Sequence, residues 1–261
     1  MTDIRLPADI LFSMGPVGVT NGHLAAFSIT ATFLIVGLIS HKRFRLVPKR
    51  FQSGIEMLME FMLAQVETAF GDKKTAQRFF PLLMTSLLFI LIANQFSLIP
   101  LVGNIVAGDT HILRPPTSDL AMTLALSLFI VLLSNVLAFS IAPLHHIGRF
   151  INIVPLFKAR SGGEFAQALL DFFLGLLDIV SEFAKIVSLS GRLFGNIFAG
   201  EVMVAVIAGL SIYTHFIVPI PFLALAILAG LVQALVFVLL STQFISSSIN
   251  GAKEARLAKA S

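Results

Sequence analysis

Residues 171–201 read DFFLGLLDIVSEFAKIVSLSGRLFGNIFAGE, an apolar segment that carries six ionisable side chains. They are Asp171, Asp178, Glu182, Lys185, Arg192 and Glu201. Ionisable groups in an apolar span are energetically costly unless they face protein or a water-filled cavity. The segment therefore predicts a helix whose polar face meets protein or water rather than lipid.

Most of these side chains share one side of that helix. From Asp171 the spacings are seven, four, three, three, four and four residues, through Asp178, Glu182, Lys185, Ser188, Arg192 and Asn196. At about 100° per residue they lie within an arc of roughly 120°. Glu201 lies nine residues after Arg192, roughly on the opposite side. The spacing predicts one polar stripe and a separate position for Glu201.

The composition around this segment is that of a membrane protein. Hydrophobic residues make up 57% of the 261 residues, charged residues 12%, and the mean hydropathy is +0.94, whereas soluble domains carry about 25% charged residues. We expect one all-α integral membrane domain over residues 1–261 with five transmembrane helices. Because a span needs roughly 20 apolar residues, the expected spans are about 24–40, 79–99, 120–142, 164–210 and 217–249.

The fourth and fifth spans are unusual, and another helix precedes the second. Residues 164–210 are too many for an upright span at about 1.5 Å per residue, so we expect a long, tilted C-terminal hairpin. In residues 52–71, apolar positions recur at helical spacing, with Glu56, Glu60 and Glu67 on another face. This pattern predicts an amphipathic helix on the membrane surface. A linker helix in water is the alternative, but nothing would then shield its apolar stripe from water.

Charge distribution predicts the orientation. One arrangement places fourteen Lys and Arg residues on the same side and leaves only Arg5 and Arg114 on the other. The positive-inside rule then puts the N-terminus outside and the C-terminus in the cytoplasm. The net charge of +4 is distributed along membrane flanks, so we expect no nucleic-acid partner. The chain has no cysteine, which excludes disulfides and thiolate metal sites; we expect no metal and no cofactor.

Arg192 is the first candidate for a functional residue. Arginine stays protonated under physiological conditions, so Arg192 is a fixed positive charge in an apolar segment. Lys185 has Glu182 three residues away, which favours a structural ion pair there. Arg192 has Ser188 and Asn196 at the i−4 and i+4 positions and neither is acidic. An internal partner, Asp178 or Glu182, is the alternative, but the pattern favours a counter-charge on another subunit.

Two stretches resemble a known family. Residues 188–201, SLSGRLFGNIFAGE, resemble the signature of subunit a of rotary ATP synthases, and residues 233–246, QALVFVLLSTQFIS, resemble its last helix. The likeness includes residues 115–119, PPTSD, and the order of the spans. The resemblance implies a proton-translocating stator subunit in a bacterial inner membrane. It also implies a ring of c subunits, b-type stalk subunits and the whole ATP synthase complex as partners.

The resemblance also implies residue roles. Arg192 matches the essential arginine that faces the ring carboxylates and separates two half-channels for H+. Asn196 and Gln233 match polar neighbours of that arginine, and Glu201 matches an acidic residue of the outer half-channel. Asp119 and His215 are further candidates for the outer path; Asp178, Glu182, Lys185 and Ser188 are candidates on the inner side. Two positions depart from the family pattern: Ala121, where Asn is frequent, and Ala226, where a second ionisable group is frequent.

Two other function classes are alternatives to a proton-translocating stator subunit. A secondary transporter is disfavoured because no inverted repeat or pair of broken helices is visible. A membrane scaffold is disfavoured by the central arginine and the carboxylate stripe, although part of the stripe, Asp171 above all, fits docking onto stator subunits. No G-x-x-x-x-G-K-[ST] loop for phosphate is present, so we expect a non-catalytic subunit.

Overall fold

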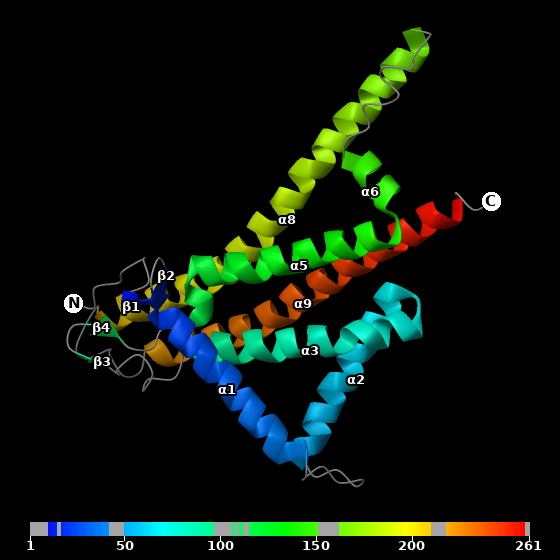
Figure 1. Ribbon diagram of the computed structural model, residues 1–261. Coiled ribbons are helices and arrows are strands. Elements are labelled where there is room, and N and C mark those ends of the chain that lie inside the picture. Colours follow the sequence, from blue (N-terminus) through cyan, green and yellow to red (C-terminus); the bar gives the residue numbers. More distant parts are fainter. Residues whose placement is uncertain are drawn as a thin grey trace. The chain divides into compact units, whose positions relative to one another are not determined.

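The computed structural model describes residues 10–14, 17–41, 50–96, 106–107, 110–111, 115–150, 162–209 and 218–258. This part of the chain is predominantly helical (Figure 1). Its helices are α1 (Asn21–His41), α2 (Arg50–Phe70), α3 (Lys73–Phe96), the 3-10 turn η1 (Pro116–Ser118), α5 (Leu120–Ile141), α6 (Pro143–Phe150), α8 (Gly162–Gly209) and α9 (Pro219–Ala258). Each predicted span overlaps a helix, so the predicted helical class is confirmed.

Two short antiparallel strand pairs were not predicted. The first joins β1 (Ile10–Met14) to β2 (Val17–Thr20), and the second joins β3 (Val106–Ala107) to β4 (Thr110–His111). Both pairs lie in segments that connect or precede the helices. They are too short to leave an alternation pattern in the sequence.

Four helices in the described part of the chain are long and apolar enough to cross a membrane. They are α1 over Asn21–Ile39, α3, α5 and α9. Two of them extend beyond the predicted spans: α3 begins at Lys73 and continues through Pro81, and α9 continues to Ala258. Asn94 and Gln95 lie in the last turn of α3, which ends at Phe96.

The chain forms two compact units, residues 1–125 with 190–239 and residues 126–189 with 240–261. In the first unit, α2 packs on α3 through a tight turn at Gly71, whose φ is +65°. The Asp72 carboxylate then accepts hydrogen bonds from the main-chain N–H groups of Lys74 and Thr75, 3.2 and 3.3 Å away. A positive φ suits glycine, and the Asp72 side chain caps the first turn of α3.

One part of the predicted apolar stripe of α2 is covered by protein. Met62, Val66 and Phe70 are buried, and the Phe70 ring stacks on that of Phe79 with centroids 5.5 Å apart. Met57 and Phe61 are 71% and 48% exposed. The same helix therefore has one face packed on α3 and a second apolar face that is uncovered in the chain alone.

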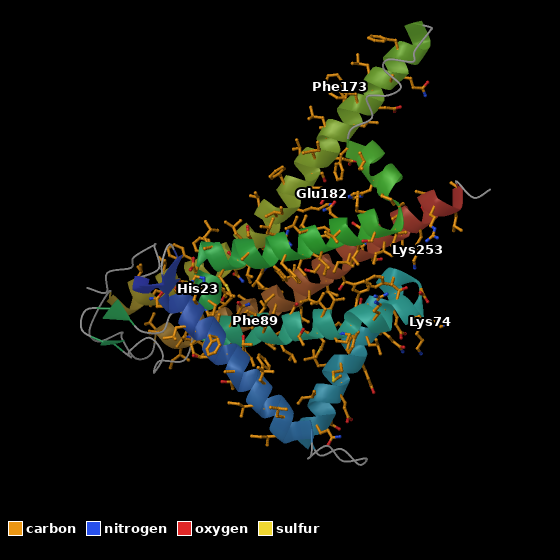
Figure 2. The ribbon with its side chains drawn as sticks, in the orientation of Figure 1. His23, Lys74, Phe89, Phe173, Glu182 and Lys253 are labelled. Carbon is orange, nitrogen blue, oxygen red and sulfur yellow. The ribbon has the colours of Figure 1, made fainter. Side chains whose placement is uncertain are left out.

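In the second unit, the polar and small residues of α5 face inward. Ser127, Ile130, Ser134 and Ala138 are buried at spacings of three, four and four residues, which is one face of a helix. Exposed side chains on this part of the chain are mostly apolar, such as Phe173 on α8, which is 53% exposed (Figure 2). Exposed apolar side chains of this kind suit a lipid environment or a partner subunit.

Candidate functional site

Arg192 lies on α8 with its side chain exposed. Among the described residues, its guanidinium has no hydrogen bond and no ion pair. Its predicted neighbours one turn away differ in exposure, since Ser188 is exposed and Asn196 is half-buried. A Cβ atom added at Gly191 or Gly195 would meet no described atom within 4 Å. The surface beside Arg192 is therefore open in the chain alone.

Two contacts set α8 beside α9 in the first unit. The Asn196 side chain donates from Nδ2 to the main-chain oxygen of Ala229 at 3.3 Å. One turn further along α8, an added Cβ at Gly200 would lie 3.8 Å from the Cβ of Ala226. Residue numbers rise on α8 while they fall on α9, so the two helices run antiparallel here. The small residues allow this close approach.

Gln233 follows on α9, one turn after Ala229. Its side chain is buried, 7% exposed, and its Nε2 has no hydrogen-bond acceptor among the described residues. A buried amide donor without an acceptor is uncommon in a folded protein. Gln233 therefore carries free hydrogen-bonding capacity near the part of α9 that lies beside α8.

Two amides from α3 also bond to α9. Asn94 donates from Nδ2 to the main-chain oxygen of Gly230 at 2.9 Å, and Gln95 donates from Nε2 to that of Ile227 at 3.1 Å. An added Cβ at Gly230 would lie 3.1 Å from Gln95 Nε2 and 3.2 Å from Asn94 Cβ. Sequence reasoning missed Gly230; a lone glycine within an apolar helix was the available signal.

The two carboxylates expected on the outer path have different surroundings. Asp119 caps α5: its Oδ1 accepts the N–H of Ala121 at 3.0 Å, and its main-chain oxygen accepts the N–H of Thr123 at 3.1 Å. Its Oδ2 lies 3.5 Å from an added Cβ at Gly22, near the start of α1. Glu201 is half-buried on α8, and its Oε1 is buried. Asp119 therefore has a structural role that the sequence did not reveal.

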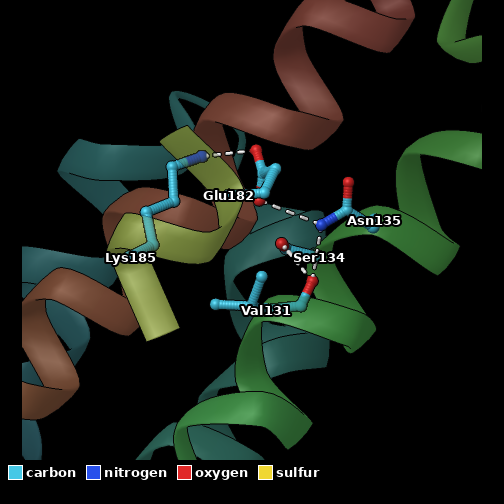
Figure 3. Close-up of polar contacts among 5 residues, drawn as sticks. All are labelled: Val131, Ser134, Asn135, Glu182 and Lys185. Atoms are coloured by element: carbon cyan, nitrogen blue, oxygen red, sulfur yellow. Dashed lines mark hydrogen bonds and ion pairs between the residues drawn. The ribbon is translucent and has the colours of Figure 1, made fainter. Parts of the chain in front are cut away.

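Glu182 and Lys185 form the predicted ion pair in the second unit (Figure 3). Lys185 Nζ lies 2.6 Å from Glu182 Oε1, and the two side chains are 24% and 13% exposed. Asn135 of α5 donates from Nδ2 to Glu182 Oε2 at 3.1 Å and to the main-chain oxygen of Val131 at 2.8 Å. Lys185 Nζ also lies 5.3 Å from the ring centroid of Phe244 on α9. These four side chains join three helices.

Comparison with known proteins identifies the family. The family model described as ATP synthase A chain matches residues 23–246. ATP synthase subunit a of Moorella thermoacetica is 31% identical over 252 residues, which cover 96% of this chain and 100% of that protein. ATP synthase subunit a 2 of a Bradyrhizobium species is 31% identical over 249 residues, 95% of this chain and 97% of that protein.

The chain belongs to the ATP synthase A chain family. It is a non-catalytic subunit of the ATP synthase membrane sector, and its apolar helices make it an integral membrane protein. A third relative, ATP synthase subunit a of Geotalea daltonii, is 27% identical over 238 residues, 90% of this chain and 91% of that protein. The matches cover nearly the whole chain, as the sequence resemblance predicts.

The remaining candidates of this family member are dispersed. Asp171 is exposed and Asp178 is half-buried, both on α8. His215 lies outside the described residues. Within the described part of the chain, no three His, Cys, Asp or Glu side chains are grouped in a way that could hold a metal ion. The structure thus brings Asn196 next to α9 and pairs Glu182 with Lys185, and it places Asp171 away from a polar partner in the described ranges.

Proposed function

We propose that this chain is the proton-translocating stator channel of a rotary ATP synthase. Arg192 would face the carboxylates of a ring of c subunits and separate two half-channels. The observation that carries the proposal is the exposed Arg192 guanidinium, which has no partner among the described residues although it lies on a largely apolar helix. A cation in such a place calls for a counter-charge outside the chain.

The antiparallel contacts between α8 and α9 support a site made by both helices. Asn196 bonds to Ala229, and Gly200 lies beside Ala226. Moving one turn back along α8 and one turn forward along α9 leads to Arg192 and Gln233. The same register therefore puts these two residues at the same level along the helix pair. The free Nε2 of Gln233 is available there to a partner or a water molecule.

The length of α8 supports a fifth, strongly tilted span. Its 48 residues extend for about 72 Å at 1.5 Å per residue, whereas the hydrocarbon core of a bilayer is about 30 Å thick. We infer a steeply tilted α8–α9 hairpin that presents Arg192 at membrane depth. The exposed Met57 and Phe61 of α2 support the placement of that helix on the membrane surface.

The two half-channels follow from the orientation. With the N-terminus outside and the C-terminus in the cytoplasm of a bacterial inner membrane, α8 runs outward. Asp178 then lies on the inner side of Arg192 and Glu201 on the outer side. Asp119 and His215 are outer-path candidates, and b-type stalk subunits would cover further exposed surface of α8. Glu182 and Lys185, which neutralise one another, fit a positioning role better than proton transfer.

Electrostatics explains why an arginine serves between the half-channels. A ring carboxylate facing lipid is neutral because desolvation raises its pKa, and a nearby fixed cation lowers that pKa. The carboxylate therefore releases its proton where it meets Arg192. A proton crossing directly would also have to pass a positive charge. Lysine serves less well, because a buried ammonium can deprotonate.

Replacing Arg192 tests the proposal. Arg192→Ala should abolish ATP synthesis and ATP-driven proton pumping in membrane vesicles, while the complex still assembles on a native gel and passive proton leak persists or grows. Arg192→Lys should also fail. Arg256→Ala, which removes an exposed arginine in the last turn of α9, is the matched control and should pump normally. Normal ATP synthesis with Arg192→Ala would refute the stator-channel proposal, and loss of assembly alone would favour a scaffold.

A further inference from the structure

Three side-chain amides bond to main-chain oxygens within four consecutive residues of α9. Asn94 and Gln95 come from α3 and bond to Gly230 and Ile227. Asn196 comes from α8 and bonds to Ala229. A carbonyl oxygen has two lone pairs, so each of these oxygens can accept an amide N–H and its own helical bond. The three amides therefore attach two helices to one turn of α9 without interrupting it.

The apolar contacts around this turn do not fix the position of α9 along its axis relative to α3 and α8. Ala226, Ala229, Gly230 and Ala234 give α9 a smooth surface of small residues. Dispersion contacts on such a surface are non-directional, and a slip of one residue moves a side chain by about 1.5 Å and about 100°. Hydrogen bonds are directional, so the amides are the groups able to fix the register.

Gly230 makes room for this arrangement. A Cβ there would approach Gln95 Nε2 to 3.1 Å and Asn94 Cβ to 3.2 Å, so an added methyl group would crowd both side chains unless they shift by a few tenths of an ångström. Gln233 lies three residues further on, and its Nε2 has no acceptor among the described residues. Its amide donor thus does not hold this part of α9 in place, and the three amides do.

We propose that Asn94, Gln95 and Asn196 form an amide clamp on residues 227–230. This clamp sets the position of Gln233 relative to Arg192 along the axes of α9 and α8. The inference rests on the proposed stator-channel function, which it deepens by assigning positioning residues. Asn94 and Gln95 act through α9 and Asn196 links α8 to it. None of the three needs to carry a proton for this role.

The cysteine-free chain allows a direct test of register. Cysteines replacing Gly200 and Ala226 have suitable geometry, because the Cβ positions are 3.8 Å apart and disulfides need about 3.5–4.5 Å. In the whole ATP synthase in vesicles, we expect rapid disulfide formation by this pair. Adding Asn94→Leu and Gln95→Leu should slow it by about threefold for each lost hydrogen bond. Gly230→Ala is a milder change and should also slow disulfide formation.

Proton pumping measured without the cysteine pair separates positioning from simple stability. Asn94→Leu with Gln95→Leu should lower proton pumping per ATP hydrolysed at unchanged complex content. Asn250→Leu, which removes an amide bonded within α9 to Ser246 at 3.3 Å, is the control and should change neither readout. Unchanged disulfide rates in the clamp variants would overturn the clamp. Slower disulfide formation with normal pumping would overturn its positioning role.

A rescue experiment addresses Asn196. Asn196→Leu combined with the cysteine pair should pump poorly when reduced and recover when the disulfide closes, because the covalent bond replaces the lost link between α8 and α9. A closed disulfide without recovery would overturn the positioning role of Asn196. The rate of disulfide formation does not depend on proton transport. The register test therefore gives a clear result even if the stator-channel proposal fails, and the Arg192 test of that proposal gives a clear result even if the clamp fails.

Discussion

Glu182 holds two polar contacts, and its replacement by leucine has a cost that follows from them. The Lys185 ammonium lies 2.6 Å from Oε1, and the Asn135 amide lies 3.1 Å from Oε2. A hydrogen bond to a charged group contributes about 1.5–3 kcal/mol, but the partial exposure of both charges reduces this. We expect Glu182→Leu to destabilise by about 3 kcal/mol, since it also leaves Lys185 without its counter-charge.

The double variant distinguishes an ion pair from a proton-path role. Lys185→Met alone should cost about 2 kcal/mol, and Glu182→Leu with Lys185→Met also about 2 kcal/mol, because removing both charges leaves neither unpaired. The coupling energy is then about 3 kcal/mol. The measurement is resistance of the purified membrane sector to rising SDS in mixed micelles, beside ATP-driven pumping in vesicles.

Two results would refute this reasoning. A coupling energy below about 0.5 kcal/mol would mean that the two charges do not interact in the folded chain. Lost pumping in a double variant whose complex still assembles at normal content would mean that Glu182 or Lys185 takes part in proton transfer. We expect instead that the double variant pumps, because the proposed inner path still contains Asp178.

Three further predictions concern other parts of the chain. Asp119→Ala should lower stability by about 1 kcal/mol through loss of the α5 cap, whereas Asp119→Asn should keep the cap and reduce pumping; normal pumping with Asp119→Asn would remove Asp119 from the outer path. Gly71→Ala should destabilise the α2–α3 hairpin by about 1–2 kcal/mol because φ is +65°, and an unchanged SDS midpoint would contradict this. Single cysteines at Leu46 and Ala260 should react with an impermeant thiol reagent only from the cytoplasm and one at Thr110 only from outside; the reverse pattern would invert the proposed orientation.

Hydrophobic length and helical periodicity predicted much of the fold. A run of apolar residues long enough to cross a bilayer is visible directly in the sequence. The predicted spans 24–40 and 120–142 therefore agree with α1 and α5 within a few residues. The Glu182–Lys185 pair was also predicted, because its partners are three residues apart on one helix. Local spacing carries this kind of information.

Contacts between distant helices could not be read in the same way. Asn135 and Glu182 are 47 residues apart and Asn94 and Gly230 are 136 apart, and nothing in a single sequence couples such positions. Asn94 and Gln95 are polar amides near the end of an apolar span, and the sequence alone names no partner for them. In the structure both residues are helical and bond to a neighbouring backbone.

The exposed guanidinium of Arg192 also affects how the chain is made. Under the proposed topology, an arginine near mid-bilayer costs about 2.5–3.5 kcal/mol during insertion. If a ring carboxylate supplies the counter-charge, as proposed, a newly synthesised copy keeps that penalty until the ring arrives. Biogenesis of this subunit would then be thermodynamically linked to the supply of the ring, and copies made in excess would be the ones most exposed to membrane proteolysis.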